Sequence, residues 1–135
     1  MIILRLRFGV LFFMLTTVSA SAAETVDFNL YCSGTKSSGL LKKMESVFSE
    51  ELRISISTGE WCKSTCFYVN KIKNVSFNEI VLDNKEDGTG WNKEYIDRRL
   101  GTYSQDLFFA LSADKFRRYA TCEKRPFSGF PKRKF

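Results

Sequence analysis

The chain of 135 residues contains no histidine, which removes several kinds of chemistry from consideration. A histidine-based catalytic triad, an imidazole general base and a zinc site that combines cysteine with histidine are all excluded. Proline is also scarce, and its two residues, Pro126 and Pro131, both lie near the end of the chain. Aromatic residues make up 15% and charged residues 27% of the chain, a composition that excludes a disordered protein. The length allows one domain.

Residues 1–23 have the three regions of a secretory signal. Arg5 and Arg7 supply the positive charge, residues 8–18 are apolar, and small residues follow at 19–23, where cleavage is expected after Ala22 or Ala23. The alternative is an uncleaved membrane anchor, but the uncharged run is shorter than the ~20 residues that span a bilayer. We therefore predict an exported protein, most simply periplasmic, with no transmembrane segment after cleavage.

Removing those 23 residues leaves about 112, and the net charge falls from +6 to +4 because two arginines leave with them. We predict three parts: the signal at 1–23, a disulfide-bonded β-rich domain at 24–122, and a basic aromatic tail at 123–135. A domain of this size buries only ~60–70% of its unfolded surface, so disulfides are a natural supplement to its core.

Four cysteines allow three pairings. We favour Cys62 with Cys66, because Lys63-Ser64-Thr65 suits the turn that brings them together, and Cys32 with Cys122, which ties the start of the domain to its end. A redox role is disfavoured because redox pairs are usually spaced by two residues and begin a helix. No metal site and no cofactor are expected.

Alternation predicts most of the fold. Leu52, Ile54 and Ile56 alternate with polar residues, as in a strand with one buried face. Residues 95–100 and 102–111 are expected to pair, with Gly101 at the break, and residues 83–90 to form a polar loop. Apolar positions from Leu40 to Phe48 have helical spacing. The prediction is a mainly β protein, an antiparallel barrel or sandwich of six to eight strands, with one short helix near 40–50.

Catalytic signatures are weak. Asp83, Glu86 and Asp87 do not follow the spacing of an EF-hand, so a solvated acidic turn is the better interpretation. Any pair among 15 carboxylates would suffice for a glycosidase-like hydrolase, so this signal carries little weight. We predict that the protein is not an enzyme.

Positive charge is concentrated at the C-terminal end, where residues 115–135 carry eight lysines and arginines against one glutamate. Outside the cytosol, the partners that fit are anionic lipid, lipopolysaccharide or an acidic envelope protein, and nucleic acid is not expected. The alternative is a solubilising end with no specific partner. The predicted anion-binding residues are Arg98, Arg117, Arg118, Lys124, Arg125, Lys132, Arg133 and Lys134.

Two short motifs resemble a known group. The first is an early Cys-x-Gly motif, which corresponds here to Leu30-Tyr31-Cys32-Ser33-Gly34-Thr35. The second is similar to an I-D/N-R-x-x-G-x-Y hairpin and corresponds to Ile96-Asp97-Arg98-Arg99-Leu100-Gly101-Thr102-Tyr103. Both occur in a loose group of small, uncharacterised bacterial exported proteins. The resemblance implies a β-rich periplasmic fold and no activity. A fainter similarity to periplasmic inhibitors of lysozyme is opposed by the basic C-terminal segment, because such inhibitors must bind a basic enzyme.

The sequence therefore predicts a non-enzymatic binding domain that contacts anionic envelope components through its basic C-terminal segment. The alternatives are an inhibitor or accessory protein of an envelope enzyme, and a small hydrolase that uses carboxylates.

Overall fold

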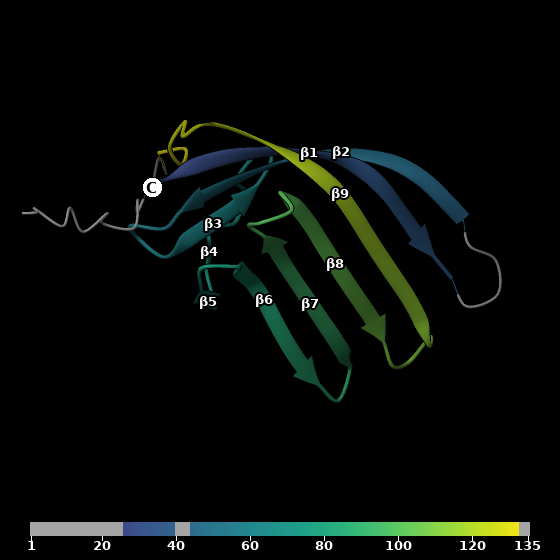
Figure 1. Ribbon diagram of the computed structural model, residues 1–135. Helices are drawn as coiled ribbons and strands as arrows, with labels where there is room; N and C mark the ends of the chain where they lie inside the picture. Colours follow the sequence, from purple (N-terminus) through teal and green to yellow (C-terminus); the bar gives the residue numbers. More distant parts are fainter. Residues whose placement is uncertain (1–25, 40–43, 133–135) are drawn as a thin grey trace, which may run out of the picture.

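The computed structural model describes residues 26–39 and 44–132, which form one curled antiparallel sheet, a half-barrel (Figure 1). The strands lie in the order β4-β3-β2-β1-β9-β8-β7-β6-β5. Their bounds are β1 Phe28–Ser38, β2 Met44–Ser55, β3 Glu60–Lys63, β4 Asn70–Lys71, β5 Asn74–Val75, β6 Glu79–Asp87, β7 Gly90–Asp97, β8 Thr102–Phe109 and β9 Asp114–Pro126. The mainly β prediction is confirmed, with nine strands in place of six to eight.

The middle of the sheet is formed by the two ends of the described chain. β1 pairs along its whole length with both β2 and β9, so that Cys32 lies opposite Cys122 on one side and opposite Glu50 on the other. β9 continues through Pro126, four residues beyond the predicted end of the domain at 122. Part of the predicted tail is therefore a strand in the centre of the sheet.

The sheet is closed at one end by the chain itself. Its two outermost strands, β4 and β5, are consecutive in sequence and are separated only by Ile72 and Lys73. The backbone N–H of Ile72 donates to Gly59 at 2.8 Å, and that of Lys73 donates to Val81 at 2.9 Å. These two bonds join the β3 side of the half-barrel to the β6 side.

The inner face of the curl holds the core. Alternate residues of each strand point to this face, and the residues buried there come from both halves of the sheet. They are Phe28, Leu30, Cys32, Leu52, Ile54, Trp61, Ile80, Leu82, Ile96, Tyr103 and Ala120. No second layer is needed, because the curl brings the two halves of one face together.

Gly34 allows two central strands to approach closely. A Cβ placed on it would lie 2.0 Å from the carbonyl oxygen of Tyr119 and 2.5 Å from the Cα of Ala120. Ala120 in turn lies opposite Tyr103 on β8. Two small residues side by side thus leave room on the inner face for the fully buried tyrosine ring.

Both predicted disulfides are present in the structure. Cys32–Cys122 joins directly opposed residues of β1 and β9, and Cys62–Cys66 closes a short loop after β3. The turn expected at residues 63–65 is there, with the N–H of Cys66 donating to Lys63 at 2.8 Å.

Two local predictions are wrong. The helix expected near 40–50 is replaced by β2 over residues 44–50, while residues 40–43 lie outside the described part. The polar loop expected at 83–90 is mostly strand, since β6 reaches Asp87 and β7 begins at Gly90. In both places the backbone is hydrogen-bonded to a strand that is distant in sequence or paired across a turn. The local spacing of apolar and polar residues does not predict such pairing. Alternation at Leu52 and Ile54 is confirmed, as both are fully buried.

Within residues 26–39 and 44–132, no helix has the length and apolar character required to cross a membrane.

The two disulfides should differ in their contribution to stability. By the chain-entropy model, Cys32→Ala/Cys122→Ala opens a loop with a sequence separation of 90 and should lower the free energy of unfolding by roughly 4–5 kcal/mol. Cys62→Ala/Cys66→Ala opens a separation of only 4 and should cost about 2 kcal/mol. Urea unfolding of both variants checks this, and an equal loss in the two would contradict it.

Candidate functional site

The cations of β9 do not gather on one surface. Arg117 and Arg118 are consecutive and so lie on opposite faces of the sheet. On the inner face, Arg118 lies 3.4 Å from Glu50 and 5.6 Å from the centre of the Phe48 ring. On the outer face, Arg117 donates from Nε to Asp106 at 2.7 Å, and this carboxylate raises the pKa of the guanidinium.

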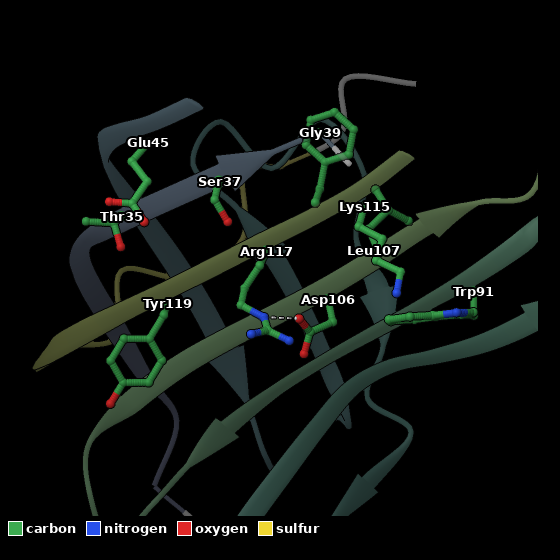
Figure 2. Close-up of a pocket in the computed structure, with 11 residues that line it drawn as sticks. Thr35, Ser37, Gly39, Glu45, Trp91, Asp106, Leu107, Lys115, Arg117 and Tyr119 are labelled. Carbon is green, nitrogen blue, oxygen red and sulfur yellow. Dashed lines mark hydrogen bonds and ion pairs between the residues drawn. The ribbon is translucent and has the colours of Figure 1, made fainter. Parts of the chain in front are cut away.

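The outer face around Arg117 is hollowed into a groove of about 410 Å³. Figure 2 shows Arg117 and Asp106 pointing toward one another, with Tyr119 on one side and Lys115 and Trp91 on the other. Glu45 also lines the groove. The two cations are matched by two carboxylates, so this groove offers no excess charge to an anion.

Residues 127–130 of the predicted tail are packed against the sheet. Ser128 accepts a hydrogen bond from Asn29 at 2.8 Å, and the carbonyl of Gly129 accepts one from Arg53 at 2.9 Å. Phe127 and Phe130 meet edge to face with ring centres 5.4 Å apart. Lys132 is exposed, whereas Arg133 and Lys134 lie outside the described residues.

A second group of cations lies where β7 turns into β8. Arg98 donates from Nη1 to the carbonyl of Ser76 at 2.7 Å, and its N–H donates to Asn78 at 2.8 Å. These bonds fasten the β7–β8 turn, residues 98–101, to the β5–β6 turn, residues 76–78. Asp97 holds the β7–β8 turn from within by accepting from the N–H groups of Arg99 and Leu100.

The same turn abuts β9. The N–H of Cys122 donates to Gly101 at 2.8 Å, and Gly101 has a φ of 65°, a conformation that favours glycine. This contact sets the turn against Cys122. Two residues further along β9, Lys124 lies 5.2 Å from the centre of the Phe28 ring, and Arg125 lies 4.5 Å from that of Tyr31. Lys124 and Arg125 thus lie on opposite faces at this end of β9, and we call the two fastened turns together with these two residues the turn end.

Two large apolar side chains project from the turn end. Phe77, in the β5–β6 turn, is 86% exposed, and Leu100, in the β7–β8 turn, is 66% exposed. Each is flanked by residues whose backbone is hydrogen-bonded, so both are displayed on ordered turns.

The inner face carries a polar cluster that the sequence analysis missed. Lys63 of β3 lies 2.6 Å from the Glu94 carboxylate of β7, whose side chain is only 3% exposed. Tyr103 donates its hydroxyl to the same oxygen at 2.5 Å. Glu94 is in phase with the buried Ile96, and a carboxylate on the apolar face of a strand was the signal available in the sequence.

The cluster continues through amide side chains. Gln105 donates to the side-chain oxygen of Asn92 at 3.1 Å and lies 3.5 Å from Oε2 of Glu94, while Asn92 donates to Asp83 at 2.7 Å. Because Glu94 is held at both oxygens by groups of the protein, it is suited to joining strands more than to transferring protons.

Burial raises the pKa of the Tyr103 hydroxyl well above its ordinary value, and the neighbouring Glu94 carboxylate raises it further. A phenolate there would lack water and would face a negative charge. Tyr103 is therefore a fixed hydrogen-bond donor.

The acidic residues near Asp83 serve local structure. Lys85 and Thr89 hold the pKa of Asp87 well below its usual range by donating to its carboxylate. Across the described ranges, no group of three or more acidic or cysteine side chains is arranged to hold a metal ion.

Comparisons with protein-family models, with curated proteins and with solved structures gave no significant match. The resemblance to small exported bacterial proteins stays a prediction.

The raised pKa of Tyr103 has a consequence for stability in alkali. In the unfolded chain tyrosine loses its proton near pH 10, whereas folded Tyr103 keeps it, so stability should fall as the pH rises above about 10 by up to ~1.4 kcal/mol per pH unit. Tyr103→Phe should be less stable at pH 7 but should lose this part of the alkaline slope.

Unfolding measured at pH 8 to 11.5 checks the prediction. The control is Tyr68→Phe, at an exposed position, which should keep the slope of the parent protein. An unchanged slope in Tyr103→Phe would contradict the prediction.

Proposed function

We propose that this protein is a non-enzymatic binding domain that docks on an anionic lipid surface through its turn end. The observation that carries the proposal is the display of Phe77 and Leu100 on two mutually fastened turns, which carry Arg98 and Arg99 and contact β9 at Cys122, two and three residues before Lys124 and Arg125. An anionic bilayer offers both an apolar phase for the first pair and negative headgroups for the cations.

The apolar part of the turn end is costly to leave in water. Moving a Phe or Leu side chain from water into an apolar phase is favourable by ~1.5–3 kcal/mol. Phe77 at 86% and Leu100 at 66% exposure gain little of this free energy in the folded protein, so most of it is available for binding. Two projecting side chains on separate turns form no flat patch of the kind that a rigid protein partner covers. They fit a medium that deforms around them, which favours lipid over an acidic protein.

Charge at the turn end is in excess on the positive side. The turn end carries four cations, against the three nearby carboxylates of Glu79, Asp97 and Glu123. Asp97 accepts from backbone N–H groups, and Glu123 lies 3.3 Å from Arg125. Each cation near an anionic surface contributes about 1 kcal/mol to binding. The basic C-terminal segment takes part through Lys124 and Arg125, whereas Arg117 lies in the charge-balanced groove.

The absence of catalysis is also a proposal, as is export, and each is supported by one feature. The carboxylates Asp83 and Glu94 share the inner face, but both accept hydrogen bonds from neighbouring side chains. Export to an oxidising compartment is supported by the two disulfides, which persist mainly in such compartments.

Vesicle co-sedimentation tests the docking. The protein should bind phosphatidylglycerol vesicles, bind phosphatidylcholine vesicles at least tenfold more weakly, and be released by 0.5 M salt because screening shortens the range of the cations. Phe77→Ser/Leu100→Ser should weaken binding at least tenfold, and Arg99→Gln/Lys124→Gln roughly tenfold or more, from ~1 kcal/mol per cation.

Matched controls come from the opposite end of the sheet. Leu111, in the β8–β9 turn, is 98% exposed, so Leu111→Ser removes a more exposed leucine, and Lys115→Gln/Arg117→Gln removes two cations of β9. Both controls should bind as the parent protein does. Equal weakening by controls and turn-end variants, or equal binding to both kinds of vesicle, would overturn the proposal.

A further inference from the structure

A pocket of about 370 Å³ opens on the inner face of the half-barrel, separate from the turn end. Its volume lies within the range of small-molecule sites, and the mouth of a barrel is a frequent place for one. Residues of β3, β4, β6, β7 and β8 and of the β4–β5 connection line it, and most of them are polar. They are Trp61, Lys63, Asn70, Lys71, Lys73, Leu82, Asp83, Asn92, Glu94 and Gln105.

One wall is a chain of hydrogen-bonded side chains. It runs from Asp83 through Asn92 and Gln105 to Glu94, with donor-to-acceptor distances of 2.7, 3.1 and 3.5 Å. These bonds use one N–H of Asn92 and both N–H groups of Gln105, so the row still offers the second N–H of Asn92 and the remaining lone pairs of the two amide oxygens. A hydroxyl group both donates and accepts, so neighbouring hydroxyls of one ligand match such a row.

The charges around the pocket are unequal. Lys63 is paired with Glu94 at 2.6 Å and Lys71 with Glu60 at 2.8 Å. Lys73 is exposed, lines the pocket, and makes no ion pair with any residue that the structure describes. Its backbone N–H is bonded to Val81, so the base of the side chain is fixed in place. One ammonium group is thus available to a ligand.

The residues beneath the polar wall are buried and closely packed. Glu94 is 2% exposed, Trp61 4% and Leu82 1%, and they belong to three different strands. Lys63 also lies 5.6 Å from the centre of the Trp61 ring and 5.8 Å from that of Tyr103. A preformed polar surface loses little conformational entropy when a ligand binds.

We propose that this pocket binds a small polyhydroxylated ligand with one carboxylate, of the size and chemistry of an acidic monosaccharide. Its hydroxyls bind along the row formed by Asn92 and Gln105, and its carboxylate pairs with Lys73. Glu94 holds the row in position. It does not bind the ligand, because Lys63 and Tyr103 already bind the carboxylate of Glu94. This inference is independent of the docking proposed for the turn end.

Titration of the ¹⁵N-labelled protein with galacturonate, followed by NMR, tests the inference. Amide resonances of β7, β8 and residues 70–73 should shift in a saturable way, while galactose, which lacks the carboxylate, should bind at least tenfold more weakly. Acetate, which lacks the hydroxyls, should cause no saturable shift of these amides.

Two variants and one control sharpen the test. Lys73→Met should weaken galacturonate binding at least fivefold and leave galactose binding unchanged. Gln105→Leu should weaken both, and its amide spectrum reports whether it folds. Lys132→Met, an exposed cation of the tail, should bind galacturonate as the parent protein does.

Galacturonate that causes no saturable shift of the pocket amides would overturn the inference. Equal weakening by Lys73→Met and Lys132→Met would overturn it as well, because the effect would then reflect net charge alone. Vesicle binding by Lys73→Met separates the two proposals, since loss of sugar-acid binding with intact vesicle binding belongs to the pocket alone.

Discussion

The ion pair between Lys63 and Glu94 joins β3 to β7, two strands with β2, β1, β9 and β8 between them in the sheet. It forms only if the sheet curls far enough to bring these strands face to face. Burial of Glu94 makes the pair a condition of the fold, since removing one partner of a buried pair costs ~3–5 kcal/mol. Tyr103 and Gln105 donate the remaining hydrogen bonds to the Glu94 carboxylate, and the apolar core lies around these side chains.

From this constraint follow two surfaces with different chemistry. Inside the curl, satisfied polar groups form the wall of a pocket, and the shape of that wall is fixed by bonds within the protein. Outside and at one end, Arg98 fastens two turns to each other and leaves Phe77 and Leu100 in water. We propose a small solute for the first surface and an anionic lipid surface for the second, and the two proposals do not compete because the surfaces are separate.

Much of the backbone was predictable from alternation and turn residues. The alternation at Leu52 and Ile54 predicted a strand, and Gly101 predicted the break between two paired strands. The small polar residues between Cys62 and Cys66 predicted a turn. β2 was missed in its first half because apolar residues there have helical spacing. In the structure Val47 is 84% exposed while Phe48 turns inward, and pairing with β1 decides the conformation. The polar cluster was missed because Lys63 and Glu94 are 31 positions apart and meet only through curvature.

Because the half-barrel closes at one end alone, two stretches of strand have a partner on one side only within the part of the chain that the structure describes. Among residues 26–39 and 44–132, β3 pairs with residues 52–55 of β2 and β5 with residues 80 and 81 of β6, so no described strand lies along the other edge of residues 44–50 or 82–87. Open edges invite pairing between separate molecules. Here the edges carry charged side chains, Glu45 and Glu50 on one and Lys85, Glu86 and Asp87 on the other. Like charges brought together at these positions would oppose the pairing of one edge with another.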